Sequence, residues 1–442
     1  MLDATTIKNN LDRVIDDLAS TPERFCNNPG VDFTRDRKLP LRDVLRFPIL
    51  MERDSVDMEL LKYFDYDLDA TPTQSAYIQQ RSKLAPDTFK MILDDFNKTL
   101  PVTQYRGKYV LYGVDGSGFN IFFNPNDPTT YNPPSGKSKL GNNEVHVVAS
   151  YRLSDLIFTD AIIQPCKEKN EYSAICDLID NCTFDDGTPL FITDRGFPSY
   201  NMFSHAKEKG VFFLSRAKDL YVERLLRKDM PEGCKEYDIT VERIITRSSS
   251  KKQRTYPDSP EKYRYVDRYT RYDYIPPGST DEYPLTLRVV RVRIGDNNYE
   301  NLITNLPSEE FDADELRILY YIRWGLETAF SYLKHAIGAI DFHCKSFANV
   351  VHEVWARLIL FNCCSAITSL AVPCQPEKSE FEYRVNFTMA FKNTHTFLRQ
   401  KKTDLIKDIM SLIERYICPI RPERYFERRH RFQLPMKFGY RH

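Results

Sequence analysis

Three carboxylates that lie far apart in the chain could together form a metal site. Asp115 follows the apolar segment YRGKYVLYGV, Asp194 follows TPLFIT, and Glu327 lies within YYIRWGLETAFSYLK. If the first two segments are neighbouring strands, their carboxylates emerge at one edge of the sheet, and Glu327 could approach from a helix. Converging acids repel one another unless cations bind between them, and oxygen ligands suit Mg²⁺ or Mn²⁺. Two such ions can activate a water or a 3′-hydroxyl for phosphoryl transfer.

Glu327 belongs to a polar stripe on its helix. Tyr320, Arg323, Glu327 and Lys334 are three, four and seven residues apart, and at about 100° per residue all four share one face. The stripe could be a solvated face with an Arg323–Glu327 ion pair worth about 0.2–0.5 kcal/mol. The many apolar residues of the segment favour a packed helix instead, and its polar stripe would then face a cleft or a partner.

The two aspartates also have structural interpretations. Asp115 in VDGSG could be a hairpin-turn residue, and Asp194 in TDRGF could cap the following helix. The chemical interpretation therefore depends on the conjunction of the three acids with the basic residues of the stripe.

The composition excludes several classes of protein. The 442 residues suggest two to four domains, and 62 Lys and Arg balance 62 Asp and Glu, so an acidic polymer would have to bind at local basic patches. The ten cysteines contain no C-x-x-C pair, which argues against a zinc module or a disulfide scaffold. No apolar leader and no run of eighteen apolar residues are present, so we expect a cytoplasmic protein with no membrane span.

The hydrophobic pattern predicts helices over residues 1–105. Pro72 and Pro86 are expected in the first turns of the last two helices. The region could be a DNA-binding helix-turn-helix or an ordinary helical bundle. The polar residues that would face DNA in the first case are Gln79, Gln80, Arg81 and Lys83.

From residue 106 the pattern changes to strands. YRGKYVLYGVD predicts a strand that ends at Asp115, and GSGFNIFF is expected to turn back as a second strand. Further strands precede an alternation of strands and helices that extends to residue 218. Antiparallel strands followed by strand-helix-strand units predict an α/β fold, with a mixed sheet covered by helices.

Residues 219–302 break this rhythm and predict a β-rich insertion with a hairpin at GDNN. We expect the core to resume over 303–370, with Glu327 on a helix at 313–336, and residues 371–442 to form a basic helical C-terminal region. From residue 421 onward this region carries seven Lys and Arg against two Glu, a composition that attracts phosphate.

The stripe and one further motif resemble a known family. The stripe fits the signature Tyr-x2-Arg-x3-Glu-x6-Lys without a gap, and DRGF at 194–197 fits Asp-x-Gly-Phe/Tyr. From about residue 60 to 370, the layout resembles the cut-and-paste DDE transposases of bacterial insertion sequences, the family numbered four. The resemblance implies an RNase H-like core over 106–218 and 303–370, interrupted by the β-rich insertion and flanked by a DNA-binding N-terminal region and the C-terminal region.

The resemblance also implies a site. Asp115, Asp194 and Glu327 would be the catalytic triad, which binds two Mg²⁺ or Mn²⁺ ions. The residues that would hold phosphates of the element's terminal nucleotides are Tyr320, Arg323 and Lys334. Arg offers a bidentate fork, Lys a point charge and Tyr a hydroxyl, all suited to phosphate.

Related enzymes nick the element ends, attack the opposite strand with the new 3′-hydroxyl, open the resulting hairpin and join the ends to a target. The expected partner is double-stranded DNA, as terminal inverted repeats and target. A homodimer on paired ends, in the nucleoid of the bacterial cytoplasm, is expected.

Several residues near the expected site have open roles. Arg195, Arg216 and Lys218 could contact DNA or form surface ion pairs. Members of the family often carry a Trp in the insertion that stacks on a flipped base, but Trp324 and Trp355 both lie outside it. Either base stacking or cross-strand packing would suit the tyrosines of the insertion, Tyr263, Tyr265, Tyr269 and Tyr272.

Two other functions fit the same residues. A domesticated, catalytically silent transposase would bind the element ends without reaction, and a related metal nuclease would cut without joining. The three intact acids favour an active enzyme.

Overall fold

The computed structural model describes residues 2–35, 37–135, 141–248, 262–295, 298–339, 341–373, 375–376, 379–400 and 408–421. Two sequence predictions fall outside this part of the chain. They are the basic end of the C-terminal region beyond residue 421 and the centre of the GDNN turn.

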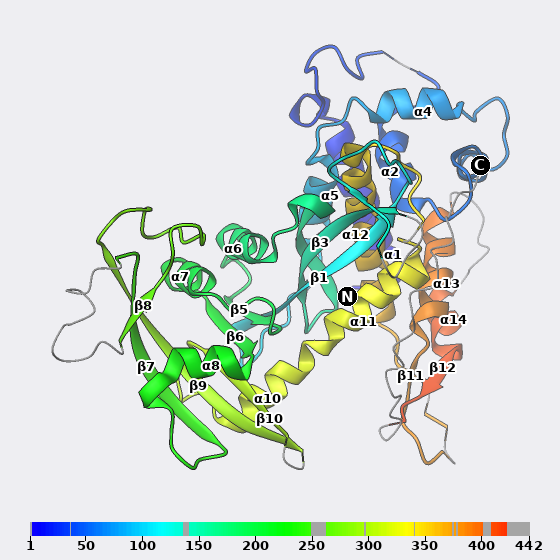
Figure 1. Cartoon of the computed structure of the whole chain (residues 1–442). Coiled ribbons are helices and arrows are strands. Elements are labelled where there is room, and N and C mark those ends of the chain that lie inside the picture. The colour runs from blue at the N-terminus through cyan, green and yellow to red at the C-terminus, as the bar shows by residue number, and fades with distance from the viewer. Residues whose placement is uncertain are drawn as a thin grey trace.

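A mixed sheet runs through the centre of the molecule (Figure 1). Strands β3 and β4 are antiparallel neighbours, β3 is antiparallel to β1, and β5 and β6 run parallel to β1. The resulting order β4-β3-β1-β5-β6 is that of an RNase H-like fold, so the predicted α/β fold class is confirmed. These strands are β1 (Tyr109–Ile121), β3 (Asn142–Arg152), β4 (Ile157–Pro165), β5 (Thr188–Thr193) and β6 (Phe212–Ala217). The short β2 (Tyr131–Asn132) pairs with the same edge of β3 as β4 does.

The strands of the expected insertion extend this same sheet. Strand β10 pairs with β6, and the order continues β10-β9-β7-β8. Strands β9 and β10 are antiparallel and flank the GDNN segment, as a hairpin requires. The added strands are β7 (Tyr237–Thr246), β8 (Tyr263–Tyr265), β9 (Glu282–Gly295) and β10 (Asn298–Thr304).

The predicted turn after Asp115 is wrong. Strand β1 continues through Asp115 to Ile121, and it stays paired with β3, with Gly116 opposite Val148 and Gly118 opposite His146. These glycines therefore serve close approach by neighbouring side chains, which is the other common reason for a glycine inside a strand.

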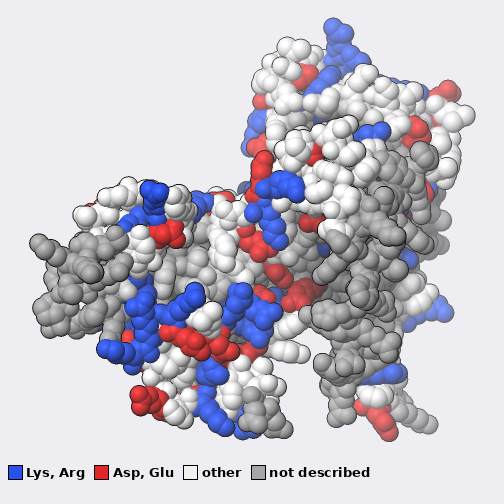
Figure 2. Space-filling model, in the orientation of Figure 1, with Lys and Arg blue, Asp and Glu red and all other residues white. Residues whose placement is uncertain are grey.

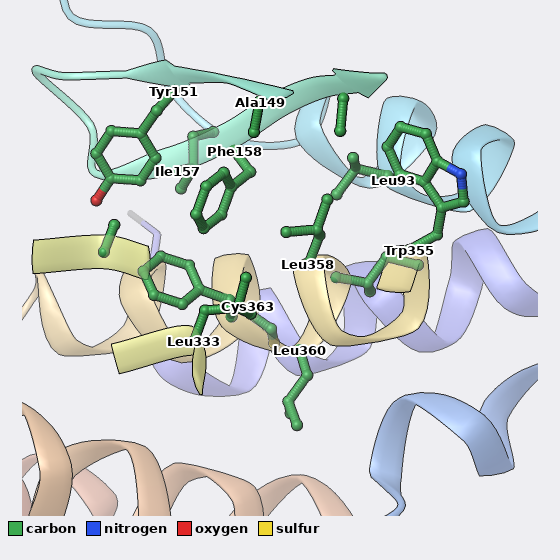
Figure 3. Packing of buried hydrophobic residues seen from close by; sticks show 14 of the residues in the cluster. Leu93, Ala149, Tyr151, Ile157, Phe158, Leu333, Trp355, Leu358, Leu360 and Cys363 are labelled. Atoms are coloured by element: carbon green, nitrogen blue, oxygen red, sulfur yellow. The ribbon is translucent and has the colours of Figure 1, made fainter. Parts of the chain in front are cut away.

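Helices cover both faces of the sheet, as predicted. One face packs against the helical N-terminal region, against α10 and α11, and against the central α12, while α6, α7 and α8 cover the other. Figure 3 shows the first of these cores, where Phe158 of β4 meets Leu358 of α12 and Trp355 lies near Leu93. The helices are α1 (Ala4–Ala19), α2 (Leu41–Leu50), α3 (Val56–Tyr63), α4 (Gln74–Arg81), α5 (Thr88–Asn97), α6 (Glu171–Asn181), α7 (Tyr200–Lys209), α8 (Asp219–Leu226), α10 (Ala313–Ile322), α11 (Trp324–Tyr332) and α12 (Phe347–Thr368).

Helix α12 has the length and hydropathy of a membrane span, but 89% of its most apolar window is buried inside the protein. It is the core helix around which the N-terminal and C-terminal helices pack. The C-terminal region contributes α13 (Phe387–Arg399) and α14 (Ile409–Arg415), together with a strand pair that the sequence did not predict, β11 (Tyr383–Val385) and β12 (Ile417–Pro419).

Details of the N-terminal helices differ from expectation. Pro72 and Pro86 each lie one residue before the N-cap, which is Thr73 for α4 and Asp87 for α5, so neither is in the first turn. Arg81 does not face solvent. Its guanidinium is buried and donates to the Tyr77 hydroxyl and to the Cys344 sulfur, and Gln80 is buried as well.

Candidate active site

The strand register brings Asp115 and Asp194 to adjacent positions. Val114 of β1 pairs with Thr193 of β5 in the parallel ladder, and each aspartate is the next residue. Side chains alternate along a strand, so both carboxylates leave the sheet on the face covered by α10 and α11. Asp115 lies inside β1, whereas Asp194 follows the end of β5.

The helix expected over 313–336 is interrupted where it crosses this edge. Helix α10 ends at Ile322, Arg323 forms a turn, and α11 begins at Trp324. In Figure 1, α10 and α11 run diagonally past the strands as one yellow rod. A π-helical turn at Leu333–Ile337 ends the rod. Such irregular turns are often found at functional sites.

Arg323 links two of the acids. Its Nη2 donates to Glu327 Oε1 over 2.9 Å, and its Nη1 lies 3.6 Å from Asp115 Oδ2. The side chain is 1% exposed. The ion pair of the solvated-stripe interpretation therefore exists, but it lies buried among carboxylates instead of in open water.

Tyr320 fixes the third acid. Its hydroxyl donates to Asp194 Oδ1 over 2.8 Å, and burial raises the pKa of this hydroxyl to about 12, so it remains a donor. Asp115, Asp194 and Glu327 are thus joined through two residues of one helical rod. The three acids of the predicted triad come from three separate elements, and each lies beside Tyr320 or Arg323.

The two aspartates have opposite pKa shifts. Burial raises the pKa of Asp115 to about 6, and repulsion from Glu327 and Asp194 adds to this rise, while the Gly116 amide and Arg323 oppose it. Burial also acts to raise the pKa of Asp194, but hydrogen bonds from the Arg195 amide and Tyr320 outweigh it and bring the pKa below its usual value. The site therefore holds one carboxylate whose charge is stabilised and one whose charge is not.

The three acids offer oxygen donors of the type that a hard divalent cation takes, but their present positions do not form a site for one. The buried Arg323 guanidinium already supplies positive charge between Asp115 and Glu327, and its Nε and Nη1 lack hydrogen-bond partners among the described residues. Within that same part of the chain, no three His, Cys, Asp or Glu side chains converge closely enough to ligate one ion. Shared ligation would require the carboxylates to move closer together.

Lys334 reaches the same strand farther along. It donates to the Gly118 carbonyl oxygen over 2.8 Å and lies 4.7 Å from the centre of the Phe119 ring, and burial lowers its pKa. All four residues of the stripe therefore face β1 or its neighbour β5, as a single helical face requires.

The other predicted contact residues lie at the surface nearby. Arg195 and Lys218 are exposed, and Arg216 is paired with Glu300 at 3.1 Å. In Figure 2, Lys and Arg gather over the part of the molecule that carries β7 to β9, with acidic residues between them. Local basic areas therefore exist on a chain of zero net charge.

The tyrosines of the insertion divide into two kinds. Tyr272 is buried and shares a 2.9 Å hydrogen bond with Ser204, which supports the packing interpretation for that residue. Tyr269 is 82% exposed and Tyr265 49%. Tyr263 is partly buried in β8.

Sequence reasoning missed two residues beside Asp115. His146 of β3 and Glu171 of α6 are 2.9 Å apart (Nε2 to Oε1) and pack directly against Gly116. The available signal was the pair of glycines in DGSGF, which we attributed to a turn instead of to close packing.

Comparisons with known proteins show which family the chain belongs to. A family model described as "Transposase DDE domain" matches residues 107–363, more than half of the chain. A search of curated proteins found no match. Among solved structures, the chain is similar to a piggyBac transposase in a synaptic complex with hairpin DNA, at 10% identity and a TM-score of 0.42, covering 93% of this chain and 85% of that one. The matched residues include all three acids and the whole polar stripe, and the chain belongs to the family of DDE-domain transposases.

Proposed function

We propose that this chain cuts and joins DNA by metal-dependent phosphoryl transfer, as a cut-and-paste transposase of the insertion-sequence family numbered four. One observation carries the proposal. Asp115, Asp194 and Glu327 come from two strands and a helix and are held at one sheet edge by Tyr320 and Arg323. No packing requirement calls for three acids there, and burial of the Asp115 carboxylate opposes its charge, as is typical of functional sites.

The proposed cofactor is Mg²⁺ or Mn²⁺, held by these three carboxylates. Two such ions would supply the Lewis acidity that activates a water or 3′-hydroxyl and stabilises the leaving oxygen. Asp194 is kept ionised by Tyr320 and by the Arg195 amide, so it is ready to ligate. Asp115 is oriented through the hydrogen bond from its neighbouring Gly116 amide, at 2.8 Å.

The basic residues of the stripe are proposed to hold DNA phosphates. Arg323 has two nitrogens without hydrogen-bond partners among the described residues, and because its side chain is 1% exposed, a phosphate oxygen would reach them only if the surrounding side chains moved. Lys334 is tied to the Gly118 carbonyl oxygen by a single hydrogen bond and could exchange that acceptor for a phosphate. Arg195, Arg216 and Lys218, which surround the end of β5 and β6, are proposed to bind the flanking duplex.

The proposed partner is double-stranded DNA, as terminal inverted repeats and as target, with two copies of the chain acting on paired ends in the bacterial cytoplasm. The test incubates the purified protein with Mg²⁺ and DNA that carries the inverted repeats flanking its own gene. Joined products support the transposase. Cleavage alone identifies a nuclease, and gel retardation alone identifies a silent DNA-binding protein.

The matched variants are Asp194→Asn and Asp314→Asn. Asp314 is exposed on α10 and pairs only with Arg317 among the described residues, so its substitution controls for the loss of one acid on the same rod. Asp194→Asn is expected to abolish cleavage and joining while DNA binding persists. Strand transfer by Asp194→Asn at the wild-type rate contradicts the proposed site.

A further inference from the structure

Gly116, the residue after Asp115, is enclosed by two side chains. A Cβ atom built on Gly116 would lie 2.7 Å from Glu171 Oε1 and 2.7 Å from His146 Nε2. Real Cβ atoms do not approach other heavy atoms this closely, so this position accepts no side chain while the two neighbours stay in place. The backbone that carries Asp115 is thus in direct contact with a carboxylate and an imidazole.

The same carboxylate reaches the second aspartate loop. The other oxygen of Glu171, Oε2, lies 3.9 Å from the Cβ position of Gly196, two residues after Asp194. The Glu171 carboxylate therefore packs against the backbone after Asp115 and faces the loop that follows Asp194. It does so from α6, which covers the sheet face opposite to α10 and α11.

Glu171 is held in place from several sides. Its Oε1 lies 2.9 Å from His146 Nε2 and 3.1 Å from Lys169 Nζ. Its backbone begins α6 directly after the N-cap Asn170, whose side chain accepts a hydrogen bond from Ser173. The contacts with His146 and Lys169 lower the pKa of Glu171, so the group is a carboxylate.

His146 is unusual for a core residue. Its side chain is 3% exposed, and Nε2 lies 2.9 Å from Glu171 Oε1 but makes no aligned hydrogen bond within the described part of the chain. A buried nitrogen with no aligned partner costs free energy. Position 146 lies on β3 opposite Gly118, within the strand pair that supports Asp115.

A simpler explanation covers only part of these observations. An acid in the first turn of α6 interacts favourably with the helix dipole, by about 0.3–1 kcal/mol. That accounts for a glutamate at position 171. It does not account for the buried His146 with an unaligned nitrogen, or for the glycine that both side chains require at position 116.

We propose that Glu171 and His146 are positioning residues of the active site, which pack against the backbone at Gly116 and so fix the carboxylate of Asp115 from behind the sheet. This inference rests on the proposed function, because it assigns the pair a role in that reaction. Neither residue touches the DNA or the reacting atoms in this role.

The test compares Glu171→Gln and Glu171→Ala with the control Glu168→Gln. Glu168 is exposed three residues earlier, outside α6. For Mg²⁺-dependent cleavage of the inverted-repeat DNA, we expect kcat to fall about 10- to 100-fold in Glu171→Ala, the range seen when supporting residues of metal sites are lost. KM and DNA affinity should stay within twofold. Glu171→Gln keeps the volume and one acceptor, so it should recover part of the kcat.

A second measurement does not depend on activity. Hydrogen exchange of the peptide spanning 113–119 should become faster in Glu171→Ala and in His146→Ala, but not in Glu168→Gln, at temperatures well below unfolding. Unchanged exchange and unchanged kcat in Glu171→Ala overturn the proposal. A uniform rise in exchange across the sheet, with a matching fall in melting temperature, also overturns it, because it indicates a purely structural role. If the wild-type protein cleaves no DNA, the proposed function fails, while exchange still tests the contact.

Discussion

Two carboxylate clusters, the buried one around Glu353 of α12 and the half-buried one of the active site, are built on different principles. Glu353 of α12 is fully buried, and its oxygens accept hydrogen bonds from the backbone and ring nitrogens of His343 and from the Cys344 sulfur, with Arg357 at 3.6 Å. In the active site, Asp115 accepts one hydrogen bond among the described residues, from its own neighbouring amide, and Arg323 Nη1 lies 3.6 Å from it.

The pKa shifts express the same contrast. Burial acts to raise the pKa of Glu353, but His343 and the arginines outweigh burial and hold it at about 2. For Asp115 burial dominates, and the pKa rises to about 6. A cluster saturated with donors stabilises the fold. A carboxylate that is short of donors and has a raised pKa is instead typical of functional sites.

The largest expected effect separates activity from stability at Asp115. Asp115→Asn removes a carboxylate that the proposed reaction needs, so DNA cleavage should fall on the order of 10⁴-fold, the scale for loss of a catalytic group. The fold should lose nothing, because the variant removes a charge that burial disfavours. Cleavage assays and thermal melting of the same preparation measure both. A large drop in melting temperature would mean that Asp115 is a structural residue.

Glu353→Ala should give the reverse result. Removing one partner of a buried ion cluster leaves His343 and Arg357 without compensation, which costs about 3–5 kcal/mol. Denaturant unfolding measures this loss, and Glu309→Ala, at an exposed position, is the control. The kcat per folded molecule should not change. If Glu353→Ala lost no more stability than Asp115→Asn, the proposed difference between the two clusters would be wrong.

The two clusters should also respond to pH with opposite signs. The pKa of Glu353 is about 2 in the folded protein and 4.5 in the reference state, so its stabilisation is present above pH 4.5 and is lost as pH falls toward 2. The pKa of Asp115 is about 6 against 3.8, so the metal-free fold loses stability as pH rises from 3.8 to 6. The free energy of unfolding of the metal-free protein, measured against pH, tests both.

The Asp115 contribution is isolated by Asp115→Asn. The difference in unfolding free energy between this variant and the wild type should grow between pH 4 and pH 6 and level off above it. A difference that stays constant over this range means that Asp115 ionises normally and that the site is better satisfied than its contacts indicate.

Much of the active-site architecture could be predicted from sequence, because it follows from local patterns. The β5 segment before Asp194 is a short apolar run, and the stripe that contains Glu327 has helical spacing. The turn expected at Gly116 is wrong because a glycine in a sequence can indicate either a turn or close packing. Only the tertiary contact with Glu171 and His146 shows that close packing applies here.

Other errors have the same origin in long-range contacts. The sequence predicts Arg81 on the polar face of a surface helix. In the structure its guanidinium is buried and donates a hydrogen bond to Cys344, which is 263 residues away in the sequence. The break at Arg323 could not be predicted from the sequence either, because its only local signal is the single Gly325, which a helix tolerates. The guanidinium lies between Asp115 and Glu327, and these acids come together only in the folded chain.

The smallest expected effect tests whether the DNA-binding surface extends from the active site to Arg216 of β6. Arg216 of β6 is 28% exposed and pairs with Glu300 of β10 at 3.1 Å, so this ion pair is screened by solvent. Arg216→Ala should therefore change the free energy of unfolding by no more than about 1 kcal/mol.

If Arg216 binds DNA, the same variant should weaken DNA affinity severalfold at low salt, and the difference from wild type should shrink as the salt concentration is raised. Glu300→Gln, which removes only the pairing acid, is the matched control for binding isotherms at two salt concentrations. Equal affinity of wild type and Arg216→Ala at both concentrations places the DNA path away from β6 and confines the functional cluster to the three acids and the α10–α11 rod.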